Sequence, residues 1–183
     1  MKQTYLGIAN DTGLGCAVPI HAAVSYDSTK TSCPFCRVNT ADDAPPRCKE
    51  LPDWMRLQLG TLDCDHSKRF FNTDFDLCVL QEPLPCDSLV KLLSDKFVPE
   101  TLQIDIEGYE YILLDGMIKE IPDKSLPPVI HFEHKVMKDQ DERHPLVNRT
   151  SRMDQVKELL GFRGYQFYDE GEDYLALKMQ HNM

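Results

Sequence analysis

Side chains capable of acid, base or ligand chemistry lie at the ends of two apolar segments in the second half of this sequence. They are Asp105, Glu107, Glu110, Glu133 and His134. Carboxylates accept hydrogen bonds and protons, and an unperturbed imidazole titrates close to physiological pH. These residues are therefore candidates for handling a ligand, and the histidine is a candidate general base.

The first three acids are predicted to lie at a turn between a strand and a helix. Residues 101–106 alternate in polarity, as a sheet strand does, whereas Tyr109 to Met117 carries apolar residues at helical spacing. Gly108 lies between the two elements and allows a sharp backbone turn. Because ligands of open parallel sheets bind at the carboxyl ends of strands, we expect the acids at this turn to face a ligand.

A second strand is predicted at Val129 to Glu133. Strand alternation places His131 and Glu133 on the same side. If that side opens onto a ligand, Glu133 can orient it and either His131 or His134 can act as a base. A core histidine explains His131 equally well. The residue types also suit a metal ion, but they follow no known ligand spacing, so no metal site is predicted.

The remaining periodic segments predict an α/β fold. In chain order, we expect a strand, a helix capped by Asp87 or Ser88, a loop or short helix, a helix that begins with a capping box, and a closing hairpin. These elements are expected at Leu77–Glu82, Leu89–Leu93, Lys135–Arg149, Ser151–Leu160 and, for the two hairpin strands, Tyr165–Tyr168 and Tyr174–Lys178.

Residues 26–75 show little periodicity and are predicted to be a loop-rich, cysteine-containing segment within a single domain. Trp54, Asp65 and His66 are candidates for lining a cleft, although a solvated loop with a packed indole explains them more simply. A chain of 183 residues with 42% hydrophobic residues is of single-domain size.

The seven cysteines all lie in the first half of the chain. In the absence of a secretory signal, free thiols in a reducing compartment are expected. Cys33 and Cys36 have the spacing of a zinc knuckle, with Cys48, Cys64 and His66 as distal ligands, but a second close pair is missing. A redox dithiol is a further interpretation, which the surrounding loop composition disfavours.

Composition excludes several partners. The formal charge of −10 would repel phosphate backbones, so nucleic acid is not expected as a partner. No apolar run is long enough for a membrane span, and the first residues lack the pattern of a signal peptide. A cytoplasmic location is the default expectation.

The pattern Leu-x-Ile-Asp-Ile-Glu-Gly-x-Glu-x-x-x-Leu-x-Gly from Leu102, followed by Ile130-His131-Phe132-Glu133, resembles the signature of FkbM-type methyltransferases. The segments His21–Ser25 and Gly164–Lys178 resemble an earlier strand and the closing hairpin of that family. The resemblance spans about residues 15 to 178. It implies a doubly wound class I methyltransferase fold and transfer of a methyl group from S-adenosylmethionine to a hydroxyl of a sugar, lipid or small metabolite.

The resemblance also implies roles for individual residues. Catalytic roles fall on Asp105, Glu107, Glu133 and His134, and cofactor contacts fall on Ala23, Val24, Ser25 and Asp105. Instead of a catalytic role, the acids can have a structural one, in which they stabilise the positive end of the following helix.

The family's glycine-rich cofactor turn and its acidic ribose-binding strand are not recognisable before Ala22. Asp11 to Gly15 looks superficially like such a turn but lacks the flanking strand and helix, and is interpreted as a simple glycine turn. Residues 1–183 are therefore predicted to be one partial methyltransferase domain, truncated at the amino terminus. An exposed sheet edge is then expected, with self-association as one way to cover it.

Two alternatives to a methyltransferase remain open from the sequence. One is a catalytically inactive, methyltransferase-like binding or regulatory module. The other is a small interaction protein stabilised by zinc.

Overall fold

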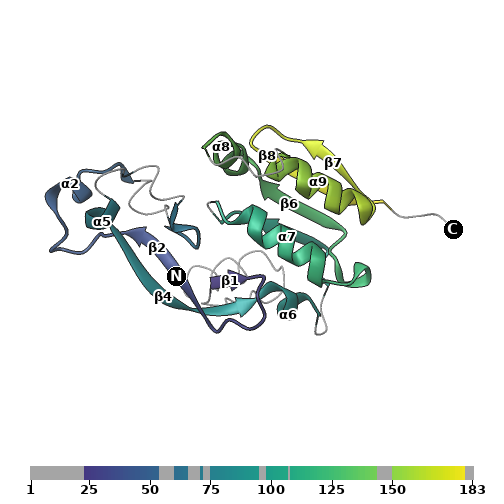
Figure 1. Cartoon of the computed structure of the whole chain (residues 1–183), viewed down its shortest axis with the longest axis horizontal. Coiled ribbons are helices and arrows are strands. Elements are labelled where there is room, and N and C mark those ends of the chain that lie inside the picture. The colour runs from purple at the N-terminus through teal and green to yellow at the C-terminus, as the bar shows by residue number, and fades with distance from the viewer. Residues whose placement is uncertain are drawn as a thin grey trace, which may run out of the picture.

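The computed structural model describes residues 23–53, 60–65, 71, 75–94, 98–106, 108–143 and 150–179. Strands and helices alternate through this part of the chain (Figure 1), which confirms the α/β class. The elements are β1 (Ala23–Ser25), β2 (Ser32–Val38), α2 (Pro46–Lys49), β3 (Gly60–Thr61), α5 (Phe75–Cys78), β4 (Val79–Ser88), α6 (Leu89–Ser94), β5 (Thr101–Ile104), α7 (Glu110–Glu120), η2 (Asp123–Ser125), β6 (Val129–Glu133), α8 (Lys135–Arg143), α9 (Arg152–Phe162), β7 (Tyr165–Asp169) and β8 (Asp173–Lys178).

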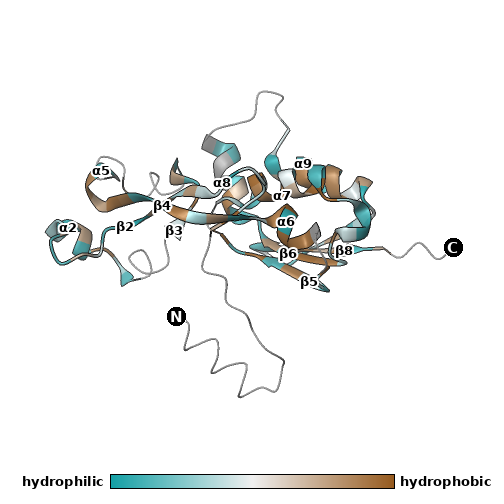
Figure 2. Ribbon diagram, turned by 90° about the horizontal axis from the view of Figure 1, so that it is seen from below, coloured by the Kyte–Doolittle hydropathy of each residue, from teal (hydrophilic) through white to brown (hydrophobic). Residues whose placement is uncertain are grey.

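The strands form two four-stranded sheets, where the sequence predicted one. The first has the order β1-β4-β2-β3 and the second the order β5-β6-β8-β7. In the second sheet β5 and β6 are parallel, and β8 is antiparallel to both of its neighbours. Figure 2 shows α6, α7 and α9 on one side of β5, β6 and β8. The carboxyl ends of β5 and β6 therefore lie at one edge of a sheet covered by helices.

The main hydrophobic core lies between these helices and the second sheet. Ile130 and Phe132 of β6 are fully buried, whereas His131 and Glu133 are partly exposed, which confirms the predicted alternation. The predicted hairpin is also confirmed, as β7 and β8. The start of α9 was predicted correctly because Ser151 caps it, accepting a hydrogen bond from the Asp154 backbone N–H at 2.9 Å.

Two boundaries differ from the prediction. The apolar run that begins at Leu77 is divided between α5 and the ten-residue strand β4, which continues through Pro83 and Pro85. The charged segment from Lys135 forms α8, although a loop was an equal expectation. The prediction for the helix after β4 holds, because Ser88 Oγ accepts a hydrogen bond from the Lys91 N–H at 3.4 Å.

The expectation of a loop-rich segment at 26–75 is wrong for β2. This seven-residue strand pairs with β4 in an antiparallel ladder from Ser32 opposite Pro85 to Val38 opposite Val79. The sequence did not reveal it because alternation in β2 is carried by cysteines and a proline rather than by large apolar residues. The predicted strand before Ala23, Trp54 and His66 lie outside the described residues.

The expectation of free thiols is wrong for the six described cysteines. They form the disulfides Cys33–Cys86, Cys36–Cys64 and Cys48–Cys78. Cys33 and Cys36 stand three positions apart in one strand, so their side chains point to opposite faces and cannot grip one ion. The disulfides therefore contradict a zinc knuckle at Cys33 and Cys36, and also a Cys33–Cys36 redox pair.

The disulfides enclose a part of the molecule that we call the disulfide lobe, residues 32–53, 60–65, 71 and 75–86. In Figure 1 it lies at the opposite end of the molecule from β7. Its buried cluster is small: Cys36, Val38, Cys48, Phe71, Cys78 and Val79. A cluster of this size contributes little hydrophobic stabilisation, so the covalent links supply much of the order in this lobe.

Candidate functional site

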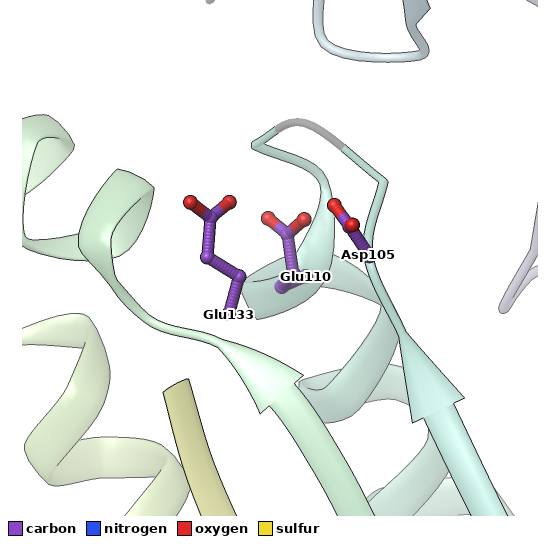
Figure 3. A group of neighbouring side chains, drawn as sticks. All are labelled: Asp105, Glu110 and Glu133. Atoms are coloured by element: carbon purple, nitrogen blue, oxygen red, sulfur yellow. The ribbon is translucent and has the colours of Figure 1, made fainter. Parts of the chain in front are cut away.

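Three carboxylates gather at the carboxyl ends of β5 and β6. Asp105 follows β5, Glu110 begins α7, and Glu133 ends β6. One carboxylate oxygen of each lies within 4.8 Å of the others, and Figure 3 shows the three side chains directed to the same side of the strand ends. The structure thus brings together three of the five candidate residues, Asp105, Glu110 and Glu133. Glu107 lies outside the described residues.

Glu110 has a structural task within this acid cluster. Its side chain is fully buried and accepts hydrogen bonds from the Ile106 N–H at 2.8 Å and the Gly108 N–H at 2.9 Å. Gly108 has a φ of 99°, which a residue with a side chain rarely adopts, so the turn requires glycine there. Burial raises the pKa of Glu110, the charge of Asp105 adds to the effect, and the backbone hydrogen bonds oppose it.

The change Glu110→Gln is expected to lower the free energy of unfolding by about 1–3 kcal/mol. The amide nitrogen of glutamine cannot accept a hydrogen bond, so the N–H of Ile106 or of Gly108 loses its acceptor in a buried turn. Urea unfolding at neutral pH measures the difference. Glu158→Gln, an exposed change of the same type on α9, is the control and should stay within about 0.5 kcal/mol of the wild type.

The wild type is also expected to lose stability as pH rises through the raised pKa of Glu110. Below the ordinary value of 4.5 both the folded and the unfolded chain hold this proton; above it the unfolded chain releases the proton first, which favours unfolding. Glu110→Gln lacks this contribution, so its urea midpoint should fall less steeply from pH 4.5 upward. Equal slopes for the two proteins would contradict the assignment.

Asp105 is exposed and Glu133 is partly exposed, so both can meet a ligand. Glu110, in contrast, is fully buried and has no surface for a ligand. Two carboxylates at a shared edge create a negative potential, which favours a cationic group. Asp105 and Glu133 can thus orient a cation or accept a hydrogen bond from a hydroxyl.

The two predicted histidines differ in their partners. His131 lies 3.3 Å from Glu170 across the sheet. His134 Nε2 donates a hydrogen bond to the Gly171 carbonyl oxygen at 2.9 Å, and its ring lies 4.3 Å from the Tyr174 ring. Since a carbonyl oxygen only accepts, Nε2 carries the proton and Nδ1 of the neutral ring is left as an acceptor. This tautomer suits a base, so His134 is the better candidate.

His134 also lines a pocket of about 490 Å³, a size typical of small-molecule sites. Other lining residues come from α8, the start of α9 and the β7–β8 hairpin; among them are Lys138, Glu142, Ser151, Met153 and Tyr174. None of these was predicted as a site residue. The sequence contained one usable signal, the spacing of Lys138 and Glu142 one helical turn apart. The rest of the lining is brought together by tertiary packing.

The predicted cofactor residues Ala23, Val24 and Ser25 form β1, which pairs with β4 and does not join β5. Ser25 is fully buried; its Oγ accepts from the Asp27 N–H at 3.1 Å, and its side chain hydrogen-bonds Tyr109. Val24 packs against the main core. The carboxyl end of β1 thus meets the start of α7, close in the chain to Glu110.

Asp65 is described and exposed, beside β3 in the disulfide lobe. The structure does not bring it into the acid cluster or the pocket lining.

No family model, curated protein or solved structure matches this chain.

Proposed function

We propose that this chain carries the acceptor-side part of an S-adenosylmethionine-dependent O-methyltransferase of the FkbM type. The observation that carries the proposal is the acid cluster at the carboxyl ends of β5 and β6, two neighbouring parallel strands, which is where ligands of doubly wound sheets bind. The antiparallel strand β8, inserted between β6 and β7, supports the same interpretation, because the family's sheet closes with a hairpin.

The described residues fit one part of S-adenosylmethionine. The negative edge formed by Asp105 and Glu133 suits its sulfonium and ammonium groups. The backbone N–H groups of Ile106 and Gly108 are bound to Glu110, so this turn offers no free donors for the cofactor's carboxylate. When bound, the cofactor supplies an electrophilic methyl group.

The chain's own residues would prepare the acceptor. Glu133 ends β6 and His134 follows it, so the acid cluster and the pocket adjoin in sequence. In the proposed reaction His134 Nδ1 takes the proton of the acceptor hydroxyl, while the Gly171 carbonyl fixes the ring tautomer. Glu133 orients the hydroxyl, and Asp105 provides negative charge opposite the cationic cofactor.

Calorimetric titration of the disulfide-bonded chain with S-adenosylmethionine and with S-adenosylhomocysteine tests the proposal. We expect saturable binding of both compounds. Asp105→Asn should weaken S-adenosylmethionine about tenfold, because one charge facing the sulfonium is lost. Asp76→Asn, the same charge change at an exposed residue of α5, should leave the affinity unchanged.

The opposite result would identify a different kind of protein. A folded chain that binds neither compound would contradict methyl transfer by these 183 residues and favour the non-catalytic, methyltransferase-like module. Such a module would explain why the backbone N–H groups of Ile106 and Gly108 are bound to Glu110 and are not available to a cofactor.

We also propose that the protein matures in an oxidising compartment, instead of the cytoplasm expected by default. Three disulfides within one lobe support this, because cytosolic thiols are held reduced. Within the described residues, none of the helices is long and apolar enough to cross a bilayer.

A further inference from the structure

The pocket beside His134 is built by three successive parts of the chain. The side chains of α8, the first turn of α9 and the β7–β8 hairpin meet around it. Two interactions fix the hairpin against the end of β6: the His134 N–H donates to the Glu172 carbonyl at 2.9 Å, and Lys135 Nζ lies 2.6 Å from Glu172. The walls are thus held by hydrogen bonds and an ion pair across the sheet.

Two acids other than Glu142 line the pocket, and both have hydrogen-bond partners within the protein. Asp141 forms an ion pair with Arg152 at 2.6 Å and also accepts from the Arg152 backbone N–H. Asp169 accepts from the Gly171 N–H at 2.9 Å and from the Tyr174 hydroxyl at 3.0 Å. These bonds hold the pKa of Asp169 below its usual value. Lys157, which donates to the Tyr174 hydroxyl at 2.9 Å, is the cation near Asp169. Both carboxylates thus have hydrogen-bond donors and a nearby positive charge within the protein.

The polar groups that are available to a ligand carry no net charge. Lys138 and Glu142 lie one turn apart on α8, both exposed, and no side-chain hydrogen bond or ion pair is found for either within the described residues. Ser151 Oγ accepts from Asp154, which leaves its O–H free to donate. His134 adds an acceptor, Nδ1. A ligand thus meets two donors and two acceptors with no net charge.

Few of the lining residues are apolar. Met153 and Tyr174 are the apolar side chains among the lining residues, and each is only 9% exposed. Lys157 lies 4.2 Å from the centre of the Tyr174 ring and His134 lies 4.3 Å from it, so the ring offers no large free face. The remaining carbon surface belongs to the stems of polar side chains, and a lipid chain packed on it would leave their polar ends without hydrogen-bond partners.

From these groups we infer that the pocket between α8, α9 and the β7–β8 hairpin binds a neutral, polyhydroxylated ligand such as a sugar ring. Adjacent hydroxyls of a sugar both donate and accept, as Lys138, Glu142 and Ser151 require. A phosphate or a carboxylate on the ligand would be attracted by Lys138 and repelled by Glu142, and a lone ammonium the reverse, so a single charge on the ligand gains little net attraction. In the second part of the inference, which rests on the proposed function, this sugar is the methyl acceptor, and His134 Nδ1 takes its proton.

The test uses the disulfide-bonded chain labelled with ¹⁵N and titrated with methyl glucoside, methyl mannoside, methyl rhamnoside and myo-inositol. At least one should give saturable shifts in the amides of α8 and of residues 150–154. Glucose 6-phosphate, alanine and octyl phosphate serve as anionic, zwitterionic and lipid-like probes and should bind at least about tenfold more weakly. Preference for any of these three would overturn the inference, as would the absence of saturable shifts with all four neutral compounds.

Variants locate the binding site. Glu142→Gln and Ser151→Ala should each weaken the best neutral compound about threefold to tenfold, since each removes or weakens one hydrogen bond. Because Ser151 also caps α9, Ser151→Asp keeps the cap but removes the donor, which separates loss of binding from loss of the helix. Glu158→Gln and Lys124→Met are exposed controls outside the pocket. Unchanged affinity in Glu142→Gln together with Ser151→Asp would overturn this placement.

The binding result and the reaction can fail separately. Saturable binding of a glycoside, without transfer of a labelled methyl group from S-adenosylmethionine, would support the pocket and contradict the proposed function. Methyl transfer to an acceptor whose binding leaves the pocket amides unshifted would contradict the pocket and support the proposed function.

Discussion

Removal of the Cys36–Cys64 disulfide is expected to lower the free energy of unfolding of the disulfide lobe by about 3–4 kcal/mol. The bond joins residues 28 positions apart, and closing a loop of that length in the unfolded chain accounts for this amount in the chain-entropy description. The buried cluster around Cys36 is too small to compensate. Cys33–Cys86, with a separation of 53, should contribute about 4 kcal/mol by the same reasoning.

The measurement is urea unfolding of the double variant Cys36→Ala with Cys64→Ala, followed by amide exchange of β2 and β4. Cys36→Ser with Cys64→Ser separates the lost bond from the changed buried side chain, because serine adds a hydroxyl in a buried position. Amides of β6 and α7 belong to the other core and serve as an internal reference. Unchanged protection of β2 in either double variant, or in the reduced wild type, would show that the disulfides do not hold the lobe.

Substitution of His134 is expected to have the largest effect on activity. If His134 removes the acceptor's proton, His134→Gln should reduce the rate of methyl transfer about 10²–10⁴-fold while S-adenosylmethionine affinity is kept. Glutamine can still donate a hydrogen bond to the Gly171 carbonyl, but it has no basic nitrogen to replace Nδ1. The rate is measured with labelled cofactor and the acceptor that shifts the pocket amides.

His131→Gln is the matched control, because His131 lies in β6 three residues before His134 and pairs with Glu170 outside the pocket lining. It should keep most of the activity. A second variant, His134→Ala, opens space at the site, and added imidazole should restore part of its rate. Equal losses in the His131 and His134 variants, with no restoration by imidazole, would mean that His134 supports the hairpin and is not the base.

The sequence determined the elements whose signals are local. In residues 101–120, alternating polarity predicts the strand, a glycine predicts the turn, and apolar residues at helical spacing predict the helix. Each of these signals depends on only a few neighbouring residues. The same holds for the Ser151 cap and for the hairpin at Tyr165–Lys178. The signature thus located Asp105 and Glu133 at neighbouring strand ends without knowledge of the fold.

Only the tertiary structure decided which of these polar residues are used internally and which face a ligand. The sequence did not distinguish Glu110 from the neighbouring acids. In the structure, α7 places its carboxylate where it accepts hydrogen bonds from the N–H groups of Ile106 and Gly108 in its own turn. The tautomer of His134 depends on a carbonyl 37 residues away. The cysteine pairs depend on the register of β2 against β4, which spacing along the chain does not specify. Contacts of this kind join distant segments, and their partners are set by packing instead of by local pattern.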